Sequence, residues 1–180
     1  MNIKGFVTMR LVDSSNGKNV PLEKAIKFGW LLDSRCSTSR RGWDVRDGEI
    51  VLGSNLFVDQ GRQMLSYLFG GKNPTSDYVC AKFGVGTGTT APKVTDVGLE
   101  SPISFVEGQE VYLKEIDGVD WPRPFVSRVE FSIGAGEANG YLIKEMGLFS
   151  GNETLIARKT YVGINKSDDF SPVWSWSIRC

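Results

Sequence analysis

Short segments in which apolar and polar residues alternate run through the second half of this chain. In residues 125–133 one face carries Phe125, Val129, Phe131 and Ile133, and the other carries Arg128, Glu130 and Ser132. Successive side chains of a β-strand point to opposite faces of its sheet, so this pattern predicts a strand with one buried face. A chain built from such segments folds by burying one side of a sheet.

The same alternation returns at the end of the chain, where Trp174 and Trp176 share a face. Buried aromatic side chains contribute strongly to a core, so we expect both tryptophans there, with a subunit interface as the alternative. Further strands are predicted over residues 79–85, 141–149 and 154–162, separated by turns rich in glycine, serine, asparagine and aspartate. The last four strands suggest an antiparallel meander.

The first 54 residues read as an appendage to this core. Residues 3–12 predict an opening strand, and the turn at residues 13–17 could begin a hairpin. Residues 33–48 are polar and rich in arginine, which predicts a long loop. We assign residues 1–54 to an N-terminal hairpin or arm with this loop, and residues 55–180 to a β-sandwich core domain.

One helix is predicted from Asp59 to Phe69. Asp59 is a favourable N-cap, and Gly70-Gly71 ends the helix. Its apolar face has the spacing i, i+3, i+4 and i+7, occupied by Gly61, Met64, Leu65 and Leu68. The predicted fold class is all-β: an antiparallel β-sandwich or flattened barrel with one short helix packed on it and an N-terminal hairpin or arm.

Histidine is absent from the sequence, which removes the commonest general base and the commonest transition-metal ligand. Basic and acidic residues both number 21, so net charge favours neither nucleic acid nor an anionic membrane as a partner. No apolar run is long enough to cross a membrane, and the first residues do not resemble a secretory signal. We expect a soluble protein without enzymatic activity, metal or cofactor.

The cysteines, Cys36, Cys80 and Cys180, are widely spaced and odd in number. They fit neither a metal knuckle nor a closed set of disulfides. We expect reduced, partly buried thiols. The alternative is a bridge between subunits made by Cys180.

The glycine-rich segment at residues 84–90 invites comparison with a phosphate-binding loop. Its spacing does not fit, because Thr89 stands where a dinucleotide fingerprint needs a small residue and Pro92 disfavours a following helix. The segment instead predicts close approach of two backbone segments or a positive φ. A paired-acid glycosidase has candidate carboxylates in Glu107, Glu110, Glu115 and Glu130, but the sequence selects no two of them.

Protein interfaces are the functional surfaces that the sequence favours. Arg40 and Arg41 stand beside Trp43, and arginine and tryptophan are common interface anchors. Contact of this segment with nucleic acid is the less favoured alternative, since the chain has no net charge. The opening strand and the Trp121-Pro122 turn are the other candidates. The predicted interface residues are Ile3, Phe6, Arg40, Arg41, Trp43 and Trp121.

Three motifs in a fixed order resemble a phage structural family. They are NLFVDQG at residues 55–61, FGVGTGTTAP at residues 83–92 continuing through TDVGLESP at residues 95–102, and IKEMGLF at residues 143–149. A strand like LIAR at residues 155–158 follows, and the chain closes on an aromatic-rich strand. Together, over residues 55–180, they resemble the tail-fibre attachment or collar domains of tailed bacteriophages.

This resemblance implies a virion protein without catalytic residues that assembles as a symmetric ring or trimer. We therefore predict a non-enzymatic structural subunit of a tailed phage particle, located at the neck or collar, tail or baseplate. Its expected partners are copies of itself and other phage tail, neck or capsid proteins. Since no fibre shaft follows, a compact adaptor is expected. The alternatives are a capsid decoration protein and a glycan-binding module or hydrolase that acts at the host surface.

Overall fold

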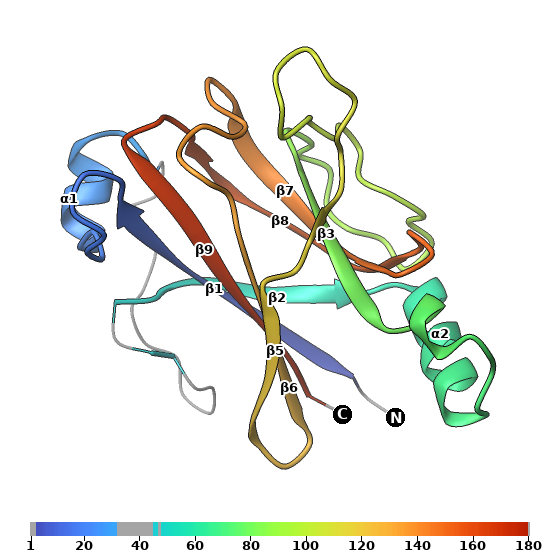
Figure 1. Ribbon diagram of the computed structural model, residues 1–180. Helices are drawn as coiled ribbons and strands as arrows, with labels where there is room; N and C mark the ends of the chain where they lie inside the picture. The colour runs from blue at the N-terminus through green and yellow to red at the C-terminus, as the bar shows by residue number, and fades with distance from the viewer. Residues whose placement is uncertain (1–2, 32–44, 47, 180) are drawn as a thin grey trace.

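The computed structural model describes residues 3–31, 45–46 and 48–179. Nine strands of this part form one sheet in which all neighbours are antiparallel, in the order β4-β3-β7-β8-β2-β1-β9-β6-β5 (Figure 1). The strands are β1 (Lys4–Asp13), β2 (Ile50–Phe57), β3 (Cys80–Gly86), β4 (Lys114–Glu115), β5 (Gly118–Arg123), β6 (Val126–Ser132), β7 (Leu142–Ser150), β8 (Leu155–Asn165) and β9 (Phe170–Arg179). The helices are α1 (Leu22–Lys27), α2 (Asp59–Phe69) and the 3-10 turn η1 (Thr75–Asp77). The predicted all-β fold with a short helix is confirmed.

The sheet curls so that its two ends enclose a common core. Phe83 lies on β3 and Phe131 on β6, close to opposite ends of the strand order. Their ring centroids are nevertheless only 4.6 Å apart, and Phe131 also stacks on Trp174 at 5.5 Å. Trp174 and Trp176 are completely buried, which confirms their predicted place in the core. The outcome is a half-barrel filled by apolar and aromatic side chains.

Strand β1 is an interior strand of the sheet, so of the predicted hairpin or arm the structure contains a hairpin and not a separate arm. It lies between β2 and β9 and pairs with β9 from Lys4–Arg179 to Asp13–Phe170 (Figure 1). Its inward side chains, Val7, Met9 and Leu11, are completely buried. The turn at residues 13–17 closes a short hairpin, because Val12 forms an antiparallel bridge with Asn19 and the Val20 amide donates to the Leu11 carbonyl at 2.8 Å. Along the rest of its length β1 pairs with strands that are distant in the sequence, β2 and β9. An amphipathic strand is most stable with a neighbour on each side.

The predicted meander is only partly correct. Strands β7 and β8 are neighbours, as an antiparallel hairpin requires. Strand β9, however, crosses the barrel to lie between β6 and β1 instead of beside β8. This pairing brings the ends of the chain together, and Figure 1 shows both termini on the same side of the molecule.

Helix α2 has the predicted bounds, although Val58 occupies the N-cap and Asp59 is its first residue. Gly61 and Met64 are its buried positions. Strand β6 begins one residue later than expected, because Phe125 lies in the two-residue loop that joins β5 to β6. Phe125 is 80% exposed, so its predicted place on the buried face of that strand is wrong.

Candidate functional site

The glycine-rich segment leaves β3 and runs against residues 100–103. The Thr87 amide donates to the Ser101 carbonyl at 2.9 Å, and the Ile103 amide donates to the Val85 carbonyl at 3.0 Å. A Cβ atom on Gly86 would lie 2.5 Å from the Ser101 carbonyl oxygen, too close for any L side chain. The predicted close backbone approach is confirmed, and it positions the loop of residues 87–102 over β7 and β8.

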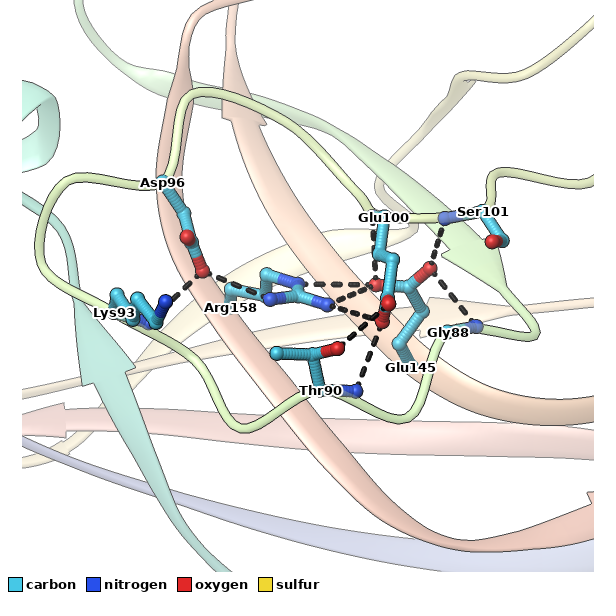
Figure 2. Close-up of polar contacts among 8 residues, drawn as sticks. All are labelled: Gly88, Thr90, Lys93, Asp96, Glu100, Ser101, Glu145 and Arg158. Atoms are coloured by element: carbon cyan, nitrogen blue, oxygen red, sulfur yellow. Dashed lines mark hydrogen bonds and ion pairs between the residues drawn. The ribbon is translucent and has the colours of Figure 1, made fainter.

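Under this loop Glu145 of β7 is completely buried (Figure 2). Its Oε1 accepts hydrogen bonds from the backbone amides of Gly88 at 3.1 Å and Ser101 at 2.7 Å. Its Oε2 accepts from the Glu100 amide at 3.1 Å and from Nε and Nη2 of Arg158 at 3.0 and 2.7 Å. The carboxylate therefore holds both ends of the loop and the neighbouring strand β8.

Arg158 of β8 is 3% exposed and continues the cluster. Its Nη1 lies 2.8 Å from Asp96 Oδ2, and its Nη2 lies 3.5 Å from Glu100 Oε2 (Figure 2). Glu100 also accepts from the amide and hydroxyl of Thr90, at 2.9 and 2.6 Å. The guanidinium thus links three carboxylates, two of them on the loop.

The pKa shifts in this cluster favour its charged form. Hydrogen bonds from Thr90 lower the pKa of Glu100. Burial alone would raise the pKa of Asp96, but hydrogen bonds from the Lys93 amide and from Arg158 outweigh it and lower that pKa. Burial opposes the charge of Arg158 as well, yet its bonds to Asp96 and Glu145 raise its pKa. Carboxylates that stay ionised are poor general acids, so the cluster suits a structural clamp better than acid-base chemistry.

Glu145 lies in the motif IKEMGLF and Arg158 in the segment LIAR, but the sequence did not predict that the two side chains pair. The available signal was a single charge inside each of two apolar strands, since a buried charge requires a partner. A register shift between Ile143 and Glu145 also turns Glu145 away from the barrel core. Such an irregularity is not visible in the alternation of the sequence.

The most exposed aromatic pair of the sheet lies on the β5–β6 hairpin. Trp121 is 73% and Phe125 80% exposed. Strand β5 ends the strand order, and the hairpin projects from the body of the molecule (Figure 1). Phe125 has a φ of 66°, a backbone conformation that favours glycine over a residue with a large side chain. The hairpin therefore displays two aromatic side chains at its tip, one of them on a strained backbone.

The predicted interface residues have different outcomes. Trp121 is exposed, as an interface residue must be, although it lies in β5 and not in a turn. Ile3 is half-buried against the core. Phe6 is 1% exposed but is not among the residues of the core cluster, to which β1 contributes Val7, Met9 and Leu11; its assignment to an interface stays a prediction. The candidates outside the described residues are Arg40, Arg41 and Trp43.

The structure gives no further support to the carboxylates considered for a glycosidase or to the cysteines as reactive groups. Glu130 forms an ion pair with Arg46, and the remaining glycosidase candidates, Glu107, Glu110 and Glu115, are exposed. Burial raises the pKa of the half-buried Cys80 to about 12, so its thiol is unreactive near neutral pH. Cys36 and Cys180 lie outside the described residues.

The described residues contain no group of three or more histidine, cysteine, aspartate or glutamate side chains that could hold a metal ion. Within the same residues, no helix has both the length and the apolar character needed to cross a membrane.

Comparison with protein-family models, with curated proteins and with solved structures finds no match to this chain. The resemblance to tail-fibre attachment and collar domains therefore stays a prediction from the motifs. The structure adds that two of those motifs meet in one place, because Glu145 of IKEMGLF holds the loop that contains GTGTTAP.

Proposed function

We propose that this protein is a non-enzymatic structural subunit of a tailed phage particle, at the neck or collar, tail or baseplate. It acts by docking onto copies of itself and onto other particle proteins. The observation that carries the proposal is the exposed aromatic tip of the β5–β6 hairpin, formed by Trp121 and Phe125. The order of the motifs supports the phage context, and the tip supports the assembly role.

The backbone at Phe125 supports an intermolecular role for its side chain. A non-glycine residue at positive φ costs on the order of 1–3 kcal/mol, and such strain persists where the surroundings or function require it. An interior contact does not explain the phenylalanine, since its side chain is 80% exposed. A ring kept at the tip despite an unfavourable backbone is suited to entering a partner surface.

Trp121 and the position of β5 strengthen the same reading. Tryptophan is the side chain most enriched among residues that dominate binding energy at protein interfaces. Among the described residues, strand β5 has one neighbour in the sheet, β6, and an edge strand of this kind can pair with another chain. Edge pairing and two aromatic anchors together give one end of the half-barrel a directional contact, as ring assembly requires.

The test separates folding from assembly with Phe125→Gly. Glycine tolerates the positive φ, so the free energy of unfolding is expected to stay the same or rise by about 1 kcal/mol. Self-association, measured by sedimentation over a range of protein concentrations, is expected to weaken at least tenfold. Phe69→Ala is the matched control, because Phe69 is 97% exposed at the end of α2. Unchanged association of Phe125→Gly would remove the hairpin from the interface.

The location of this protein in the phage particle has to be determined on assembled particles. Antibody label against the chain is expected at the neck, tail or baseplate in electron micrographs of particles of the phage that encodes it. Label over the capsid would replace the tail assignment with a decoration role. Purified particles that lack the chain would overturn the proposal.

A further inference from the structure

The tip of the β5–β6 hairpin has a possible counterpart at the opposite end of the molecule. A hollow of about 500 Å³ opens between residues 102–112 and residues 136–141. Residues 136–141 follow β6 in the chain, whereas the hairpin loop precedes it. Figure 1 shows the hairpin at the bottom of the molecule and the loops beyond the other end of β6 at the top. The hairpin tip and the hollow therefore lie at opposite ends of one strand.

The hollow has an apolar floor and an aromatic rim. Ile103 and Ala138 form the floor, and both are buried members of the core of the half-barrel. Tyr112 and Tyr141 lie at the rim and are 42% and 44% exposed. Within the described part of the chain, neither tyrosine ring packs on another aromatic ring or on a cation. These two rings are thus open to a contact from outside the molecule.

The tip comprises residues 121–125, with the sequence Trp-Pro-Arg-Pro-Phe. The rings of Trp121 and Phe125 also pack on no other ring or cation of the described residues. Pro122 and Pro124 restrict the backbone between them, because the proline ring fixes φ near about −65°. A restricted segment loses little conformational entropy when it binds. Aromatic-lined grooves are common receptors of proline-rich segments, so the rim of the hollow is chemically suited to this tip.

The charges of the two surfaces are complementary. Of the described residues that line the hollow, only Glu107 is charged, and its exposed carboxylate forms no ion pair with the described residues. The charged residue of the tip is Arg123. Two tips, or two hollows, would bring like charges together, whereas a tip in a hollow brings opposite charges together. Complementary charge of this kind selects one pairing over the others.

The tip cannot reach the hollow of its own molecule. Strand β6 has seven residues, and a strand rises about 3.3 Å per residue, so about 20 Å separates its two ends. A contact between tip and hollow therefore requires two molecules. Because the two surfaces differ, such a contact leaves one copy with an empty hollow and the other with a free tip, and further copies can add.

From these features we propose that the hollow receives the hairpin tip of a second copy of this chain, in a head-to-tail contact. The aromatic rings and prolines of the tip pack on Tyr112 and Tyr141, and Arg123 faces Glu107. Repetition of the contact closes a ring where the rotation between copies permits, and otherwise extends a filament. This inference rests on the proposed function, because it takes the hairpin as the docking element and adds the surface that receives it.

The experiment removes one side of the contact at a time. Phe125→Gly removes a ring from the tip. Gly136→Trp fills the hollow, and the fold accommodates it because a Cβ atom there meets no atom within 4 Å and the backbone is not left-handed. Each variant alone is expected to self-associate about tenfold more weakly than the natural chain in sedimentation, or more weakly still. Glu107→Arg is a second hollow variant at an exposed position and is expected to weaken association severalfold.

Mixing the variants tests the head-to-tail geometry. Phe125→Gly keeps an intact hollow, and Gly136→Trp or Glu107→Arg keeps an intact tip. An equimolar mixture of a tip variant and a hollow variant is therefore expected to form dimers of one copy of each, with the affinity of the natural contact and with no larger species. Gly98→Trp is the matched control, because Gly98 also has no atom within 4 Å of its Cβ and lies outside the hollow. It is expected to associate like the natural chain.

The outcomes separate this inference from the proposed function. Weak association of Phe125→Gly with unchanged association of both hollow variants would overturn the head-to-tail contact and leave the docking role of the hairpin. Weak variants that do not rescue each other in the mixture would overturn it too, because a tip-to-tip contact gives that result. A natural chain that stays monomeric at every concentration would also overturn it. Unchanged association of Phe125→Gly would instead remove the hairpin from the interface, and the proposed docking element with it.

Discussion

Glu145 and Arg158 each join their own strand, β7 or β8, to the loop of residues 87–102. Each is almost fully buried, and each satisfies the charge of the other. Removing one member of such a pair leaves an uncompensated buried charge, which costs far more than the pair contributes when complete. The cluster is therefore a sensitive point of the structure even though it sits beside a surface loop.

We predict that Arg158→Met lowers the free energy of unfolding by about 3 to 5 kcal/mol, because the buried Glu145 then loses its charged partner and has only backbone amides as donors. Urea unfolding followed by tryptophan fluorescence measures this change. Arg62→Met is the control, since Arg62 pairs with Asp59 on the exposed surface of α2 and such a pair contributes at most about 1 kcal/mol. Equal effects of the two substitutions would contradict the clamp.

Lys166 gives the stability a pH dependence. Its side chain is 1% exposed, and Nζ donates to the Ala135 carbonyl at 3.0 Å, to Asn139 Oδ1 at 2.8 Å and to the Ser167 carbonyl at 2.6 Å. Burial lowers the pKa of Lys166 from 10.5 to about 8, although nearby carboxylates oppose the shift. Between these two pKa values the unfolded chain binds more protons than the folded chain.

Since the unfolded state binds the extra proton, the contribution of Lys166 to the free energy of unfolding rises as pH increases from about 8 to 10.5. We predict that this rise is present in the natural chain and absent in Lys166→Met. Urea unfolding of both chains at several pH values measures it, and the difference between them removes the titration of all other groups. Parallel curves for the two chains would show that Lys166 titrates normally.

At the scale of the element, the loop of residues 87–102 depends on the space left by Gly86. We predict that Gly86→Ala lowers the free energy of unfolding by about 1 to 3 kcal/mol, because its Cβ would overlap the Ser101 carbonyl. Gly98→Ala in the same loop meets no atom within 4 Å and is expected to change that energy by less than about 0.5 kcal/mol. Thermal unfolding of both variants tests the difference.

The elements were predictable where their signals are local. Helix α2 followed from its apolar spacing and the glycine pair after it, and its bounds are those expected. Phe125 was wrongly assigned to the buried face of a strand. The alternation of apolar and polar residues does not show where a two-residue loop reverses the chain. The burial of Phe6 was not predicted, because its strand was taken for part of a hairpin or arm and not for an interior strand of the sheet.

The arrangement of strands and the ion-pair cluster were not predictable in the same way. The pairing of β1 with β9 joins residues more than 150 positions apart in the sequence, and nothing local to either strand names the other. Glu145 and Arg158 were visible as charges in apolar strands, but their shared partners on the loop depend on how that loop crosses β7. Non-local geometry decides both features.

For the whole molecule, the pairing of the chain ends closes the fold. Strand β1 pairs with β2 on one side and with β9 on the other. It therefore joins the half of the sheet that contains β2 and β8 to the half that contains β9 and β6. These contacts join residues from nearly the two ends of the chain, so the entropy cost of closing a long loop precedes the stabilisation that strand pairing brings. Folding on the millisecond-to-second scale is therefore expected. The half-barrel therefore forms as one unit that includes its first strand.

This unity gives a prediction that separates an interior strand from an arm. We expect the amides of β1 to exchange with solvent deuterium only through global unfolding, because both of its edges are paired. The amides of β5, which has one neighbour, are expected to exchange at least about a hundredfold faster through local opening. Hydrogen exchange followed by NMR under native conditions compares the two strands within one sample. If β1 instead exchanged as fast as β5, the first strand would be a detachable arm, and the two halves of the barrel would have to be held together by their side chains alone.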